Sequence, residues 1–194
     1  MGGHLGGNRG DSVDGVSMIV QLPAAMVPGV GRLIDERRRL GLDLFDEWHE
    51  GVYVILAGPS PEHGEVAAEL ITVLGPLARA RGLRIATPTN IGTDEDDSRV
   101  PDLTIYRPDT PRTSPPFLAT AELAVEVLSP RERPQAKLGF YATHGVREYV
   151  EVDPHARTVR LWRNVDGSWH ESTRSEVLDF DCSTVASDID WPDL

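Results

Sequence analysis

The stretch that decides the fold spans residues 121–153 and reads AELAVEVLSPRERPQAKLGFYATHGVREYVEVD. Its first part, residues 121–129, is an apolar run of strand-forming residues. Residues 133–145 then predict a short helix that Gly145 closes, because glycine commonly ends helices. Residues 147–153 predict a further strand. The stretch therefore predicts a strand, a helix and a strand in succession.

A longer helix precedes this stretch. It starts with Ser60 as N-cap and Pro61 at its first position, and it is expected to end at Gly82. Two further strands are predicted over residues 83–92 and 100–108. The core order is thus a helix, three strands, a helix and a strand, which favours an α+β fold with a mixed central sheet.

Two β-hairpins flank this core. Residues 42–49 and 52–58 alternate around Glu50 and Gly51, and residues 158–164 and 167–173 do the same around Asp166 and Gly167. We expect residues 1–18 to be a flexible leader and residues 19–194 to form one domain. Within that domain we place the core at about residues 45–154 and a C-terminal hairpin and tail at residues 155–194.

The composition excludes several classes of protein. The 194 residues are 40% hydrophobic and 26% charged, as in globular domains, and no apolar run is long enough to cross a membrane. The single cysteine, Cys182, excludes an internal disulfide and fits a cytoplasmic protein in which it fills apolar space. The net charge of −12 does not favour binding of nucleic acid through its phosphates.

Two carboxylates lie on neighbouring strand candidates. Asp102 begins one strand, and Glu126 lies inside the apolar run of the next, on the face opposite to Val125 and Val127. A carboxylate buried in such a strand is costly unless it is paired, hydrogen-bonded or bound to a metal. With the carbonyl of Val127, the two carboxylates could hold Mg²⁺ or Mn²⁺, which prefer oxygen ligands.

Lys137 is the only lysine among the 19 lysine and arginine residues of the chain. Its compact ammonium can act as a point donor to a water or to a phosphorane, a role for which a guanidinium is less suited. Structural roles remain open: Asp102 as a turn residue after proline, Glu126 as the partner of an arginine, and Lys137 as a solvated charge. We expect Glu148 and Glu151 to face solvent.

The ordered motifs VPDLTIYRP, LAVEVLSP and KLGFYATHGVREYVEVDP resemble the Uma-two family of putative restriction endonucleases, within the PD-(D/E)XK nuclease superfamily. The resemblance covers about residues 45–154. It implies a restriction-endonuclease-like fold, a metal-dependent endonuclease activity and a homodimer. Asp102 and Glu126 match the two acidic positions of the superfamily motif. Leu128 stands where its lysine normally is, and Lys137 matches the lysine that this family carries on the following helix.

The resemblance also implies further site residues. Glu47, in the first hairpin, matches an early glutamate that is an additional metal ligand, and His63 and Tyr141 match polar positions beside the site. Lys137 and Tyr141 are four residues apart, so a helix places them on one face. Two departures from the family bear on activity: the loop between Glu126 and Lys137 is short, and Glu151 replaces an apolar residue.

The leading interpretation is a metal-dependent endonuclease that uses Asp102, Glu126 and Lys137. The alternative is a non-catalytic module with the nuclease fold that acts in assembly or regulation, which the acidic charge and the short loop favour. A glycosidase with Asp102 and Glu126 as acid and base is a weaker third reading, because it leaves Lys137 without a role.

Overall fold

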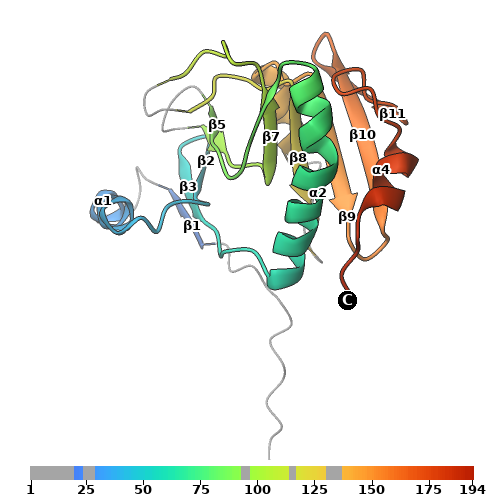
Figure 1. Ribbon diagram of the computed structural model, residues 1–194. Coiled ribbons are helices and arrows are strands. Elements are labelled where there is room, and N and C mark those ends of the chain that lie inside the picture. Colours follow the sequence, from blue (N-terminus) through green and yellow to red (C-terminus); the bar gives the residue numbers. More distant parts are fainter. Residues whose placement is uncertain (1–19, 24–28, 93–96, 114–116, 130–136) are drawn as a thin grey trace, which may run out of the picture.

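The computed structural model describes residues 20–23, 29–92, 97–113, 117–129 and 137–194. The expected leader, residues 1–18, and most of the loop before Lys137 lie outside these ranges. The described residues form two β-sheets and four helices, an α+β arrangement (Figure 1). In this part of the chain no helix has both the length and the apolar character to cross a bilayer.

The larger sheet has six strands in the order β11-β10-β9-β8-β7-β4. Strands β8 and β9 are parallel and every other neighbouring pair is antiparallel, so this is the mixed sheet that was predicted. The second predicted hairpin, β10 and β11, extends its edge. The bounds of the strands are β4 Arg84–Ala86, β7 Leu103–Tyr106, β8 Leu123–Val127, β9 Glu148–Asp153, β10 Thr158–Val165 and β11 Ser168–Ser172.

The first predicted hairpin lies in a separate sheet of five short strands, in the order β1-β3-β2-β6-β5. The single strand predicted over residues 83–92 is wrong, because this segment divides into β4 of the larger sheet and β5 of the smaller one. The two halves of residues 83–92 therefore belong to different sheets. The bounds are β1 Val20–Pro23, β2 Glu47–His49, β3 Val52–Ile55, β5 Ile91–Gly92 and β6 Ser98–Arg99.

The long predicted helix is α2, Pro61–Ala80. Ser60 caps it by accepting a hydrogen bond from the amide of His63, and Gly82 ends the turn that follows with a φ of +69°. Helix α3, Leu138–Thr143, begins directly after Lys137, and Gly145 follows it with a φ of +68°. Residues 133–136 of the predicted helix lie outside the described ranges. Helix α1, Val30–Leu40, ends at Gly41, whose φ is +66°, and α4, Cys182–Asp188, lies in the segment predicted to be a tail.

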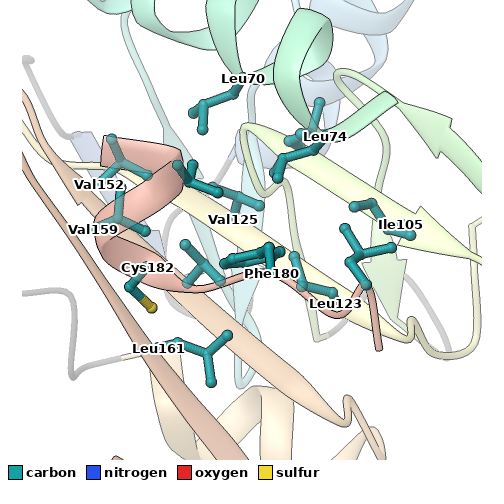
Figure 2. Packing of buried hydrophobic residues seen from close by; sticks show 14 of the residues in the cluster. Leu70, Leu74, Ile105, Leu123, Val125, Val152, Val159, Leu161, Phe180 and Cys182 are labelled. Carbon is teal, nitrogen blue, oxygen red and sulfur yellow. The ribbon is translucent and has the colours of Figure 1, made fainter. Parts of the chain in front are cut away.

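The larger sheet is covered on both faces. Helices α2 and α4 pack on one face around Val125, Leu70 and Phe180, and Cys182 is buried in the same cluster as an apolar filler (Figure 2). Helix α3 covers the opposite face, where Tyr141 packs among other aromatic side chains. Strands β8 and β9 are therefore buried on both sides, which is the usual situation of parallel strands.

This burial contradicts the expectation that Glu148 and Glu151 face solvent. Their exposed fractions are 2% and 4%, because β9 lies in the middle of the sheet between β8 and β10. Glu148 accepts hydrogen bonds from the hydroxyl of Ser175 and from the amides of Glu176 and Val177, so it anchors the C-terminal segment. Burial raises the pKa of Glu148 even though these three donors act against the rise.

Candidate functional site

Lys137 lies between two buried carboxylates. Its Nζ atom is 3.1 Å from Oε1 of Glu47 and 3.1 Å from Oε1 of Glu126. The side chains of Glu47 and Glu126 are 1% and 5% exposed, and that of Lys137 is 14% exposed. One ammonium therefore faces two carboxylates that have been removed from water. It offsets one of their two negative charges, and the desolvation of all three groups is energetically costly.

These three residues come from separate parts of the fold. Glu47 lies on β2 of the smaller sheet, Glu126 on β8 in the middle of the larger sheet, and Lys137 at the start of α3. The predicted alternation along β8 is confirmed, because Val125 and Val127 face the α2 side. The site therefore forms only when both sheets and α3 are in place.

Tyr141 completes this group. Its hydroxyl donates a hydrogen bond to Oε1 of Glu126 over 2.5 Å, and its helical spacing from Lys137 places both side chains on the Glu126 side of α3. Burial raises the pKa of Tyr141 well above its ordinary value, and the charges of Glu126 and Glu47 raise it further. The phenol is therefore a neutral donor at physiological pH.

Glu47 has two partners besides Lys137. The amide of Val100 donates to its Oε1 over 2.9 Å, and Nε2 of His49 lies 2.7 Å from its Oε2. Burial disfavours the charged form, but the charge of Lys137 and the bonds from His49 and Val100 outweigh it and lower the pKa of Glu47 from 4.5 to about 2. Glu47 is therefore ionised throughout the physiological range.

The pKa of Glu47 predicts a specific acid sensitivity. Because its folded pKa lies below its ordinary value, its ionisation stabilises the fold above about pH 4.5, and this stabilisation is lost as the pH falls towards about 2. We expect the difference in unfolding free energy between the wild type and Glu47→Gln to shrink over that interval. Denaturant titrations at a series of pH values, with a chelator present, would measure it. A constant difference would contradict the low pKa.

Asp102 makes its contacts elsewhere. Its Oδ1 lies 2.8 Å from Nε2 of His63 on α2, and its Oδ2 accepts a hydrogen bond of 2.8 Å from the amide of Val127. The structure thus brings Glu47, Glu126, Lys137 and Tyr141 into one group and Asp102 and His63 into a second. The two groups meet at the backbone of Val127, the residue after Glu126.

The pairing of β7 with β8 determines where the carbonyl of Val127, one of the predicted metal ligands, points. The two strands are antiparallel neighbours, as the sequence reasoning assumed, and their ladder ends at the pair Leu103 and Val125. The amide of Val127 points to Asp102, and within a strand the carbonyl of a residue points to the same side as its amide. The carbonyl of Val127 therefore lies on the Asp102 side of the strand.

The donor types fit a hard divalent cation, although no ready-made cage is present. Asp102, Glu126 and Val127 offer carboxylate and carbonyl oxygens, which Mg²⁺ and Mn²⁺ prefer. Among the residues that the structure describes, no group of three or more His, Cys, Asp or Glu side chains is arranged to hold a metal. The ammonium of Lys137 shows that the space between Glu47 and Glu126 favours positive charge.

Sequence reasoning missed three residues of this region. His49 follows Glu47 at the strand spacing of two, so alternation could have placed both on one face. Glu151 stands opposite Glu126 in the parallel register of β8 and β9, which only the strand order reveals. Arg99 is buried with its guanidinium 4.4 Å from the ring of Phe140, and it donates to the carbonyl of Trp48.

Arg99 therefore ties α3 to the hairpin. Phe140 is three residues after Lys137 on α3, and Trp48 follows Glu47 on β2. The guanidinium also donates to Asp97 over 2.8 Å, at the residue directly before β6. This contact holds the helix that carries the ammonium against the strand that carries one of its carboxylates.

Comparison with protein families matches residues 43–183 of the chain to Uma2, described as putative restriction endonuclease. The match extends beyond the resemblance at residues 45–154 and includes the C-terminal hairpin and the start of α4. A comparison with curated proteins gave no match.

Among solved structures, the chain is similar to a putative nuclease of DUF820 from Anabaena variabilis ATCC 29413, determined at 1.96 Å resolution. The TM-score is 0.58 at 20% identity, over 74% of this chain and 90% of that one. A DrdV-DNA complex matches with a TM-score of 0.36 at 13% identity, over 70% of this chain and 12% of that one. The first likeness confirms the predicted α+β class with a restriction-endonuclease-like core.

Proposed function

The chain belongs to the Uma2 family of putative restriction endonucleases, and we propose that it is a nuclease that hydrolyses phosphodiester bonds with a bound divalent cation. The observation that carries this proposal is the meeting of an acidic pair and an ammonium at β8. Glu126 contacts Lys137, and Asp102 binds the amide of the very next residue. Family membership alone supports the nuclease activity, and this geometry supports the dependence on a cation.

In this proposal, Asp102, Glu126 and the carbonyl of Val127 hold Mg²⁺ or Mn²⁺, and Glu47 is an additional acidic ligand. When bound, the cation supplies Lewis-acid stabilisation of the charge that develops on a phosphate. Lys137 donates from its ammonium to a water or to a phosphate oxygen at the same place. Tyr141 keeps Glu126 oriented, and His63 orients Asp102.

The proposal is tested by a melting curve and a cleavage assay on the same sample. At a Mn²⁺ concentration about 100 times its Kd, binding stabilises the fold by about 2.7 kcal/mol. For a chain of this size we expect the melting temperature to rise by roughly 5–10 °C. Single-stranded and double-stranded DNA and RNA would be incubated with the protein in Mn²⁺, in Mg²⁺ and in a chelator. Cleavage that persists in the chelator, or no cleavage of any substrate, would contradict the proposal.

A specific observation favours a second candidate, a nuclease-fold module without catalysis. Lys137 already places a positive charge between Glu47 and Glu126, and the net charge of −12 opposes binding of a polyanion. In that case the ammonium of Lys137 permanently takes the place of a metal cation and has a structural role. The melting temperature would then stay constant in Mn²⁺, so the melting curve separates the two candidates.

A further inference from the structure

A cavity of about 320 Å³ opens beside Asp102. It lies between α2, the segment before β2, and the loops that precede β5 and β7. Its walls are mainly apolar and include Phe45, Pro88, Ala67 and Ile71. Its volume falls at the lower end of the range of about 300–1,000 Å³ that is typical of pockets for small organic ligands.

The polar groups of this cavity gather at the end near the candidate site. His63 and Asp102 line it together, with Nε2 of His63 2.8 Å from Oδ1 of Asp102. The hydroxyl of Thr87, another lining residue, donates to the carbonyl of Asp102 over 2.6 Å. Asp102 also accepts a hydrogen bond from the amide of Val127, so this end of the cavity lies beside the residue that follows Glu126.

We propose that this cavity binds one unstacked base of a single nucleic-acid strand next to the phosphate that the site acts on. The inference rests on the proposed nuclease function and names how its substrate is recognised. A base turned out of its stack is held in protein pockets by apolar and aromatic side chains on its faces and by polar groups at its edge. The cavity offers this combination, with the ring of Phe45 and aliphatic side chains as apolar walls and with His63 and Asp102 at its polar end.

The charge of the chain favours a base over a phosphate as the main contact. Binding through phosphates requires clustered lysine and arginine side chains and weakens steeply with salt. The net charge is −12, and among the residues that the structure describes neither lysine nor arginine lines the cavity. Stacking of a base on apolar and aromatic side chains works without a basic surface, because every base has an apolar face.

The test compares two strands that differ only in their bases. One is a short fluorescent oligothymidylate, and the other is an abasic strand of the same length and charge. Both are titrated with the full chain in a chelator, so that no cleavage occurs. We expect the oligothymidylate to bind tighter by roughly tenfold, the effect of one stacked base, and we expect this ratio to persist at higher salt.

Gly64 offers a variant that fills the cavity. It lines the cavity on α2, and a Cβ at this position would meet no atom of the surrounding structure within 4 Å, so Gly64→Phe places a ring at the cavity wall from a position that has room for its Cβ. Ala68→Phe, on the same wall, is a second variant in case the first does not fold. Gly31→Phe is the matched control, because Gly31 lies in the first turn of α1, has the same free space and does not line the cavity.

Gly64→Phe or Ala68→Phe is expected to abolish the preference for the strand with bases, and Gly31→Phe is expected to keep it. Equal binding of the two strands by the wild type would overturn the inference, and so would a preference that survives in both cavity variants. Cleavage in Mn²⁺ is scored separately. A wild type that cleaves without preferring bases refutes the pocket alone, whereas one that prefers bases without cleaving refutes the nuclease proposal alone.

Discussion

Glu126→Gln is expected to lower the rate of cation-dependent cleavage by roughly 10³-fold. The substitution keeps the shape of the side chain and an acceptor for Tyr141, but it removes the negative charge that the proposed cation site requires. A bound cation contributes several kcal/mol to stabilisation of the transition state, and each 1.36 kcal/mol corresponds to a factor of ten in rate. Single-turnover cleavage at saturating Mn²⁺ would measure the loss, and Asp102→Asn is expected to give a similar one.

Glu148→Gln is the control for this experiment. Glu148 is also a buried glutamate in the larger sheet, but it binds Ser175 and the backbone of the C-terminal segment. We expect this variant to be less stable than the wild type while it cleaves at the wild-type rate below its melting temperature. A Glu126→Gln protein that keeps more than about a tenth of the wild-type rate would reject Glu126 as a cation ligand.

Local signals in the sequence were sufficient for the elements that build the site. The N-cap Ser60 and Pro61 predicted the start of α2, and strand alternation predicted that Glu126 turns away from Val125 and Val127. The spacing of Lys137 and Tyr141 predicted that they share a helix face, and both contact Glu126. These predictions succeeded because each depends on neighbours within a few residues.

The errors concern long-range pairing. Burial of Glu148 and Glu151 depends on β9 lying between β8 and β10, and no local pattern carries that order. The division of residues 83–92 between two sheets depends on β5 pairing with β6, which lies outside the predicted strands. The contact of Arg99 with Phe140 joins a short strand to a helix about forty residues later in the chain.

The pairing of Asp102 with His63 also depends on long-range packing and could not be predicted from local sequence patterns. Both residues were expected near the site, but no local pattern indicated that they pair with each other rather than with Lys137. The pairing arises because α2 packs across β7 and β8, which brings the first turn of the helix to the start of β7. The separation of the two groups is therefore a property of helix-on-sheet packing.

Lys137→Met is expected to have the largest effect on stability. The substitution keeps a long apolar stem but leaves Glu47 and Glu126 buried without the ammonium that lies 3.1 Å from each of them. Removing one partner of a buried ion pair costs about 3–5 kcal/mol, and the partial exposure of Lys137 places the expected loss near the lower end, about 3 kcal/mol. Denaturant unfolding in a chelator would measure this loss as a shift of the midpoint at constant slope.

Two variants separate this effect from a general loss of surface charge. Arg39→Met removes an exposed ion pair to Glu36, whose side chain is 54% exposed, and is expected to cost about 0.5 kcal/mol or less. Adding Glu47→Gln to Lys137→Met removes one of the two uncompensated charges and is expected to restore part of the lost stability, a coupling that a double-mutant cycle measures. Equal losses for Lys137→Met and Arg39→Met would mean that the ammonium is solvated rather than buried between its carboxylates. Lys137 would then not be the group that holds the site together. Only an ammonium shielded from water attracts two carboxylates strongly enough to hold β2, β8 and α3 together.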